Sequence, residues 1–318
     1  MSSSSANDPL PELSVVVPLL NEANNLELLY QRLSTVLEQE EVTFELIFVD
    51  DGSNDNSLAV IRQLRDQDPR IRYVSLSRNF GHEAASSCGL HRSRGKAVVL
   101  MDADLQDPPE VIPQMLTLWR QGNLVVNARR RSRLGETWFK KATSHLFYRI
   151  INLVSEVHIL PDVGDFRLVD RTLIEVFKAM PEHNRFLRGM FSWIGFPQIT
   201  IDFDRQERRS GYTKYNTLKL TLLSLEALSG FSIFPLRLCA SLGLIIVMGC
   251  ILATLAVVAH RLFFGLDLPG YTLLTAGTFL LGGTQLVFLG IIGEYVGKIY
   301  KQVQQRPLYV IKEEEKSG

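Results

Sequence analysis

The sequence predicts an α/β protein in which a mostly parallel, doubly wound sheet is followed by two transmembrane helices. Short β-rich runs alternate with helical stretches over residues 13–126, which is the pattern of strands joined by crossover helices. Two long apolar runs, residues 238–259 and 268–293, contain no charged residue over 22 and 26 positions. The chain has 34 basic and 34 acidic residues and a formal net charge of zero, so its composition gives no indication of nucleic-acid binding.

The elements of the predicted sheet domain follow a serine-rich stretch, residues 1–11, which we expect to be a disordered leader. We expect strands at residues 13–17, 44–49, 71–76, 97–100 and 124–126. Between them we expect helices at residues 24–39, 57–65 and 83–91, and a further helix that begins at Pro108 and Pro109. Asn24 and Glu27 have the spacing of a capping box at the start of the first helix.

Polar residues follow four of the predicted strands at the point where each strand ends. These residues are Pro18, Asn21 and Glu22; Asp50 and Asp51; Arg78 and Asn79; and Asp102 and Asp104. Any one of them could be only a turn or a helix cap. Open α/β sheets bind ligands at the carboxyl ends of their parallel strands. Four successive polar strand ends therefore indicate a binding site at that edge.

Asp102 and Asp104 lie directly after the apolar run 97–100, one residue apart. Two carboxylates at this spacing offer the hard oxygen ligands that Mg²⁺ and Mn²⁺ prefer, and a substrate phosphate can complete the coordination shell. The same motif also occurs in ordinary turns, so the interpretation depends on the neighbouring strand ends. We expect the pair to hold Mg²⁺ or Mn²⁺ against a diphosphate group.

Each long apolar run can cross a membrane, because about 20 residues at a rise of about 1.5 Å span a hydrocarbon core of about 30 Å. A pair of buried core helices is the alternative. Basic residues flank the outer ends of the pair, whereas the connecting loop carries only Arg261. The outer basic residues are Lys219, Arg237, Lys298, Lys301, Arg306 and Lys312. The positive-inside rule therefore predicts that the sheet domain and the C-terminal tail are both cytosolic.

Five stretches together resemble family-2 glycosyltransferases of the GT-A (Rossmann-like) fold, specifically the polyprenyl-phosphate branch that includes bactoprenol glucosyltransferases and dolichol-phosphate mannose synthases. The stretches are VVPLLNE at 16–22, FVDDGS at 48–53, SRNFGHEA at 77–84, MDADLQDPP at 101–109 and RRSGYTKY at 208–215. The resemblance covers most of the chain. Leu19 and Leu20 replace a common Tyr, and His82 replaces a common Lys, which could affect the choice of nucleotide.

The resemblance implies inverting transfer of a hexose, with glucose favoured, from a UDP-sugar to polyprenyl (undecaprenyl) phosphate. It assigns Pro18, Glu22 and Asp51 to the nucleotide. Asp104 becomes the metal ligand, Asp102 contacts the ribose or the metal, and Gln106 supports the metal. An ionised Asp51 would be a strong acceptor for a pyrimidine ring N–H.

A polyprenyl phosphate brings its own nucleophile, since an alkyl phosphate is mostly dianionic near neutral pH. The site instead needs positive charge to bring two anionic groups together. Arg208, Arg209 and Lys214 can supply it to the acceptor phosphate, with Arg208 also assigned to catalysis; the alternative is a basic cluster that binds lipid headgroups. By the resemblance, Asp165 is the candidate that positions the acceptor or assists as a base, and Asp162 is the second candidate.

The expected organisation has six parts. They are a leader at 1–11, a cytosolic GT-A catalytic domain at 12–205, a juxtamembrane basic loop and interfacial helix at 206–234, transmembrane helices at 235–262 and 268–297, and a cytosolic tail at 298–318. Residues 138–154 and 215–230 have the pattern of interfacial helices, although the first could equally pack on the sheet. Gly293 and Gly297 have the spacing of a helix-packing face, and family members often assemble, so we expect a homo-oligomer.

The expected location is the bacterial cytoplasmic (inner) membrane, with the protein crossing it more than once. Within the same reaction class, the donor sugar could be mannose or a modified arabinose in place of glucose. From a different class, the protein could be a nucleotide-binding membrane scaffold without catalytic activity. Asp102, Asp104 and Arg208 argue against a scaffold, because such a protein has no need of a metal pair or a cation for the acceptor.

Overall fold

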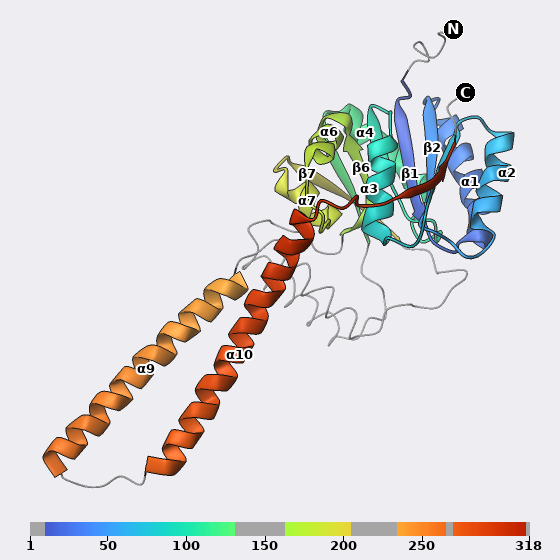
Figure 1. Cartoon of the computed structure of the whole chain (residues 1–318). Coiled ribbons are helices and arrows are strands. Elements are labelled where there is room, and N and C mark those ends of the chain that lie inside the picture. Colours follow the sequence, from blue (N-terminus) through green and yellow to red (C-terminus); the bar gives the residue numbers. More distant parts are fainter. Residues whose placement is uncertain (1–9, 131–162, 205–233, 265–269, 316–318) are drawn as a thin grey trace. The chain divides into compact units, whose positions relative to one another are not determined.

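The computed structural model describes residues 10–130, 163–204, 234–264 and 270–315 (Figure 1). The chain divides into two compact units. Among the described residues, the sheet unit consists of residues 10–130, 163–204 and 306–315, and the helical unit consists of residues 234–264 and 270–305. Most of the predicted leader, both predicted interfacial helices (138–154 and 215–230) and all of the predicted basic loop except residue 234 lie outside the described residues.

The described part of the sheet unit contains one eight-stranded sheet with the order β7-β5-β6-β4-β1-β2-β3-β8. The strands are β1 Leu13–Leu19, β2 Phe44–Asp50, β3 Ile71–Leu76, β4 Ala97–Leu100, β5 Val125–Arg130, β6 Val163–Asp170, β7 Gln198–Phe203 and β8 Ile311–Glu314. β1 pairs in parallel with both β2 and β4, whereas β6 is antiparallel to both of its neighbours and β8 is antiparallel to β3. The predicted mostly parallel α/β sheet is therefore confirmed, with β6 and β8 as its reversed strands.

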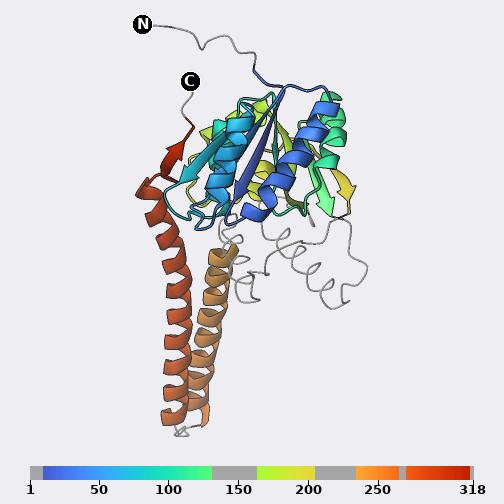
Figure 2. The same cartoon turned by 90° about the vertical axis from the view of Figure 1, so that its right-hand side faces the viewer.

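Helices cover both faces of this sheet (Figures 1 and 2). They are α1 Ala23–Gln39, α2 Ser57–Gln67, α3 His82–Arg92, the short 3₁₀ helix η1 Pro109–Val111, α4 Ile112–Arg120, α6 Arg171–Ala179 and α7 Leu187–Trp193. α1, α2 and α4 pack into one apolar core with the sheet, while α3 contacts α6 and α6 contacts α7. The helices predicted at 24–39, 57–65 and 83–91 are confirmed. The predicted capping box is wrong, because α1 begins at Ala23 and no side chain caps it.

α3 approaches the sheet closely because position 89 is glycine. A Cβ at Gly89 would lie 2.2 Å from Cγ1 of Val16 and 3.1 Å from Cγ2 of Val49. No side chain fits at that distance from two packed methyl groups. The glycine therefore sets how near α3, which begins at His82, lies to the ends of β1 and β2.

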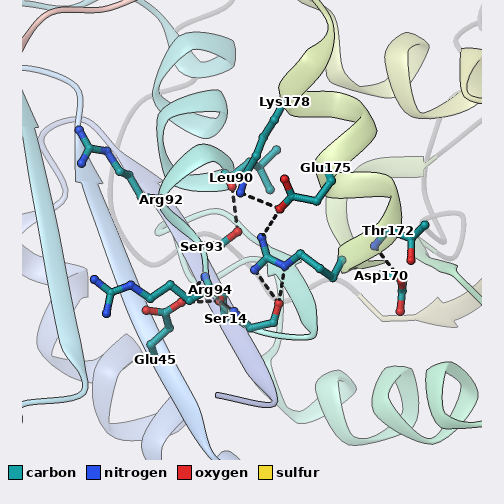
Figure 3. A network of polar contacts seen from close by, with 12 residues as sticks. Ser14, Glu45, Leu90, Arg92, Ser93, Arg94, Asp170, Thr172, Glu175 and Lys178 are labelled. Carbon is teal, nitrogen blue, oxygen red and sulfur yellow. Dashed lines mark hydrogen bonds and ion pairs between the residues drawn. The ribbon is translucent and has the colours of Figure 1, made fainter. Parts of the chain in front are cut away.

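The amino-terminal edge of the sheet is closed by a polar network (Figure 3). Oγ of Ser14 donates to Oε1 of Glu45 at 2.6 Å and accepts the backbone N–H of Gly95 at 2.7 Å. Arg171 donates from Nε and Nη2 to the carbonyl oxygen of Gly95 at 2.8 and 2.6 Å, and it also pairs with Glu175. These bonds satisfy buried polar groups within the chain, so this edge is a structural one and the opposite edge is left for ligands.

The chain returns to the sheet unit after the second long helix. Residues 306–315, here called the C-terminal segment, lie along α3 and end as β8 at the β3 edge. Oη of Tyr309 lies 3.1 Å from Nδ1 of His91, and Glu313 accepts hydrogen bonds from Arg62 and, at 2.8 Å, from Oη of Tyr73. Residues 298–318 were expected to be a tail, and the strand β8 was not predicted.

The helical unit contains α9 Phe234–Phe264 and α10 Gly270–Val303. These helices include most of the stretches predicted as membrane spans, 235–262 and 268–297. Within the described residues, no helix combines the length and the apolar character that a membrane span needs. The two spans therefore stay a prediction.

Candidate active site at the carboxyl edge of the sheet

The strand directions bring the predicted site residues to one edge of the sheet. β1, β2 and β4 are parallel and end at Leu19, Asp50 and Leu100. β6 is antiparallel to β4, so its first residues lie at the same edge as the last residues of β4. Glu22, Asp51, Asp102, Asp104 and Asp165 are therefore brought to one edge, although Asp165 lies near the start of β6 and the others follow their strands.

The loops after β1 and β2 are joined by side-chain hydrogen bonds. Oγ of Ser53 accepts the backbone N–H of Asn21 at 2.9 Å, and Oδ1 of Asn21 accepts the N–H of Asn54 at 2.8 Å. The backbone N–H of Glu22 donates to Oγ of Ser57 at 3.0 Å. Asn21 has a φ of 58°, a left-handed conformation that Asn tolerates better than most residues. Pro18 is buried within β1, one residue before its end.

Asp51 organises the loop after β3. Its two carboxylate oxygens accept the backbone N–H groups of Phe80 and Gly81 at 2.7 and 2.9 Å. Burial raises the pKa of Asp51, and these two hydrogen bonds lower it by less. Gly52, with a φ of +69°, lies so close to Arg78 that a Cβ would be 2.5 Å from its carbonyl carbon. The predicted nucleotide residue Asp51 therefore also joins the ends of β2 and β3.

The turn after β4 presents Asp102 and Asp104 half-buried. Oδ1 of Asp104 accepts the backbone N–H of Gln106 at 3.1 Å, and Leu105 between them has a φ of 62°. A left-handed Leu is strained, and such strain is characteristic of functional turns. Burial raises the pKa of Asp102, and the carboxylates of Asp165 and Asp104 raise it further against the opposing charge of His82. Holding two carboxylates this close favours a cation between them.

Asp107 is the buried acid of the same turn, and it was not among the predicted site residues. It is 1% exposed, and neither of its oxygens accepts a hydrogen bond of normal geometry in the described chain. Nη2 of Arg130 lies 3.5 Å from its Oδ1. Burial and the charge of Asp102 raise the pKa of Asp107 to about 7. A buried carboxyl that has one arginine nearby, accepts no hydrogen bond from the described residues and lies beside two other acids indicates that this turn can accommodate further positive charge.

The described part of the chain contains no group of three or more His, Cys, Asp or Glu side chains arranged to hold a metal. Mg²⁺ is commonly held by only one or two carboxylates together with substrate phosphates. Asp102 and Asp104, with the unsatisfied Asp107 beside them, fit that arrangement. Gln106 is buried, and its contribution to a metal remains a prediction.

Asp165 is surrounded by cationic side chains. Arg188, on α7, donates from Nε and Nη2 to its two oxygens at 2.9 and 3.1 Å. Nη2 of the buried Arg167 lies 3.8 Å from Oδ1, and Nε2 of His82 lies 3.5 Å from Oδ2. Burial alone would raise the pKa of Asp165, but Arg188 and His82 outweigh burial and hold that pKa well below its usual range. Such a carboxylate is a weak base.

Comparison with known proteins decides the family of this site. The model of glycosyl transferase family 2 matches residues 14–177, which include β1 to β4 and their polar ends. A prophage-derived bactoprenol glucosyl transferase of Shigella flexneri is 38% identical over 301 residues, which is 95% of this chain and 97% of that protein. The chain belongs to glycosyl transferase family 2. The prediction of an enzyme, specifically a glycosyltransferase, is confirmed, and the non-catalytic scaffold is set aside.

Two further proteins resemble this family-2 transferase. An uncharacterized glycosyltransferase of Synechocystis is 43% identical over 300 residues, which is 94% of each chain. Glucosyl-3-phosphoglycerate synthase from Mycobacterium tuberculosis, solved with Mn²⁺ and UDP, is 20% identical, with a TM-score of 0.44 over 69% of this chain and 78% of that one. A likeness at that level does not carry its ligands over to the transferase described here.

Four predicted residues of the transferase lie outside the described residues: Arg208, Arg209, Lys214 and Asp162. Their assignments stay predictions. Two cations that contact Asp165, Arg167 and Arg188, were not predicted as site residues, and His82 was expected only to differ from the family. The one signal for His82 is its place at the start of a helix directly after Gly81, in a stretch that follows a strand end.

The imidazole of His82 should titrate far above its ordinary range in the metal-free transferase. Burial alone would lower its pKa, but the hydrogen bond with Asp165 and the charge of Asp102 raise that pKa to about 9. Because the folded pKa lies above the unfolded value of 6.5, the stabilisation is complete below about pH 6.5 and is lost as the pH rises through about 9. An NMR titration of the His82 ring should show this midpoint, and Asp165→Asn should lower it. A midpoint near 6.5 in the native protein would contradict the arrangement.

Proposed function

We propose that this transferase moves glucose from UDP-glucose to polyprenyl (undecaprenyl) phosphate, with inversion at the anomeric carbon, at the cytosolic face of the bacterial inner membrane. The observation that carries the proposal is the similarity to the Shigella bactoprenol glucosyl transferase, which extends over 95% of this chain. A likeness over nearly the whole length includes both long helices and the C-terminal segment as well as the sheet. It therefore supports a shared acceptor as well as a shared fold.

The donor nucleotide would bind at the ends of β1 and β2. Pro18 lies at the end of β1, and the loops that carry Glu22 and Asp51 are fixed by the hydrogen bonds described above. A rigid pair of loops orders few side chains when the ligand binds, which favours affinity. Asp51 retains lone pairs after accepting two N–H groups, so it can still accept the ring N–H of a pyrimidine.

Asp102 and Asp104 would hold Mg²⁺ or Mn²⁺ together with the diphosphate, supported by Gln106. A bound divalent ion would neutralise the charge that develops on the leaving diphosphate. The strained turn at Leu105 keeps both carboxylates at the edge of β4 before any ligand arrives. A cation bound at this turn would also favour the ionised form of Asp107, whose pKa is otherwise raised to about 7.

The acceptor phosphate would attack the anomeric carbon directly. A dianionic phosphate needs little help from a general base, and Asp165 with its lowered pKa is poorly suited to that task. Arg208, Arg209 and Lys214 would attract the phosphate from the membrane side. Attack opposite to the leaving diphosphate inverts the configuration, so the product would be the β-glucoside of the lipid phosphate.

The membrane location rests on the character of α9 and α10. Large apolar side chains on both helices are strongly exposed in the single chain, for example Leu244 at 66%, Leu274 at 71% and Leu286 at 71%. Apolar surface of that extent needs a covering of lipid or protein. Two spans with cytosolic outer ends, in a homo-oligomer that uses Gly293 and Gly297 for packing, would provide both.

A transfer assay with membranes of cells that express the chain tests this function. Radiolabelled UDP-glucose, GDP-mannose and an aminoarabinose nucleotide would each be supplied with undecaprenyl phosphate, and the lipid product would be isolated and its anomer determined. We expect glucose to be transferred fastest, to give the β-linked lipid. Faster transfer from another donor would overturn the choice of sugar, and an α-linked product would overturn inversion. The absence of any lipid product would overturn the acceptor.

A further inference from the structure

The cations that surround Asp165 differ in how far they reach solvent. The Arg167 side chain is only 2% exposed, and it donates to the carbonyl oxygen of Gly164 at 2.9 Å. The side chains of Arg188 and His82 are 34% and 39% exposed. Asp165 itself is 11% exposed. The part of this cluster that a ligand can touch is therefore mainly cationic, while the acid lies beneath it.

The sheet order gives this cationic surface a definite place in the site. Along the carboxyl edge, β2 and β1 carry Asp51 and Glu22, β4 carries the metal pair, and β6 follows with Asp165. Nε2 of His82 lies 3.7 Å from Oδ1 of Asp102 and 3.5 Å from Oδ2 of Asp165, so it bridges the last two of these positions. The cationic surface formed by Arg188 and His82 thus lies next to the proposed metal ligands Asp102 and Asp104, on the side away from the proposed nucleotide site.

We infer that Arg188 and His82, held in place by Asp165, bind the phosphate of the acceptor, and that Asp165 is a positioning residue and not a base. The inference rests on the proposed function, because it presumes a phosphate acceptor. In a direct displacement the attacking group approaches opposite to the leaving diphosphate, and a surface that lies beside Asp102 and away from the proposed nucleotide site suits that approach. Arginine fixed by one carboxylate presents a planar guanidinium in a single orientation, which suits recognition of phosphate oxygens.

Two further contacts fix the orientation of the cluster. The backbone N–H of Leu187, directly before Arg188, donates to Oε2 of Glu83 at 3.0 Å, and Glu83 directly follows His82. This hydrogen bond joins the first residue of α7 to the second residue of α3. His82 and Arg188 each lie directly beside one of the two residues that it joins. His82 and Arg188 are therefore held in position by α3, α7 and β6 before the acceptor arrives. Binding the acceptor then needs little further ordering of these side chains.

Binding and kinetics of the full-length transferase in detergent or nanodiscs test this inference. Farnesyl monophosphate serves as the acceptor probe and UDP as the donor probe, each titrated by calorimetry. We expect Arg188→Gln to weaken farnesyl phosphate binding by about tenfold to a hundredfold, because a charge-assisted bond is lost, and to leave UDP binding within about twofold. Arg188→Lys should restore part of the affinity. Asp165→Asn should raise the KM for the lipid phosphate more than it lowers kcat.

A matched control is Arg32→Gln, since Arg32 on α1 forms an equally bidentate pair with a different acid, Glu110, at 2.9 and 2.6 Å. It should change neither affinity. Unaltered farnesyl phosphate binding in Arg188→Gln, or an equal loss of UDP binding, would overturn the inference. Asp165 would be shown to act as a base if Asp165→Asn kept a normal KM for the acceptor, lost a thousandfold in kcat and shifted the acid limb of the pH profile. If the native protein binds UDP but neither binds nor glycosylates an isoprenyl phosphate, the proposed function fails instead.

Discussion

Replacing Asp104 with alanine is expected to lower the rate of sugar transfer by about a thousandfold or more. Loss of a ligand that helps to neutralise the leaving diphosphate removes several kcal/mol of transition-state stabilisation, and about 4 kcal/mol corresponds to a factor of about a thousand. Asp104 is half-buried in a turn that follows β4, and its Oδ1 accepts the backbone N–H of Gln106, so we expect the protein still to fold. The transfer rate and the binding of Mn²⁺ in the presence of UDP are the quantities to measure.

The matched control for this variant is Asp66→Ala, which removes an exposed carboxylate from α2 on the outside of the sheet unit. We expect it to transfer sugar at the native rate. An Asp104→Ala protein that keeps both its rate and its requirement for Mg²⁺ or Mn²⁺ would remove the metal from the proposed mechanism. A second variant, Asp107→Asn, should weaken the binding of Mn²⁺ in the presence of UDP without abolishing it, because this buried acid supports the metal site but is not required for it.

Deleting residues 306–318 is expected to destabilise the sheet unit by about 3 kcal/mol, which corresponds to a fall in Tm of about 6–12 °C. The deletion removes β8 from the edge of β3 and breaks the ion pairs of Glu313, Glu314 and Glu315 with Arg62, Arg92 and Arg65. It also removes Tyr309 from its contact with His91 on α3. Thermal unfolding of the purified full-length and shortened proteins measures the effect.

A single ion pair should not account for this loss. Glu110→Ala breaks the exposed pair with Arg32 without removing a strand, and we expect a change below about 1 kcal/mol. An unchanged Tm in the shortened protein would mean that β8 adds nothing to the sheet. A loss confined to Glu313→Ala would assign the effect to one side chain.

The first four strands and three helices could be predicted because local sequence determines them. The inner strands of a parallel sheet are buried on both faces, and β2 accordingly has no exposed residue over Phe44–Asp50. Apolar runs such as 46–49 are therefore recognisable as strands from the sequence, and the Asp and Gly residues that follow mark their ends. Asp51, Asp102 and Asp104 were found for the same reason.

The strand at 124–126 was also predicted, as the start of β5, but β6 and β8 could not be predicted because their patterns are broken by charge. β6 carries Asp165, Arg167 and Asp170 among its apolar residues, and Arg167 is 1% exposed, which no local pattern indicates. β8 is the four-residue stretch Ile311–Glu314 with only one apolar residue, and it is a strand only because β3 offers an open edge. Likewise Arg188 joins Asp165 through tertiary contact, 23 positions along the chain.

The position of β8 in the chain has a consequence for biosynthesis. Residues 311–314 are translated after both long helices, yet they complete a sheet whose first strand begins at Leu13. Until they leave the ribosome, β3 presents unpaired N–H and C=O groups that can associate with other chains. Completion of this catalytic fold is therefore timed to follow synthesis of α9 and α10, so a nascent chain that stalls before residue 311 should be trapped with its outermost strand exposed to chaperones.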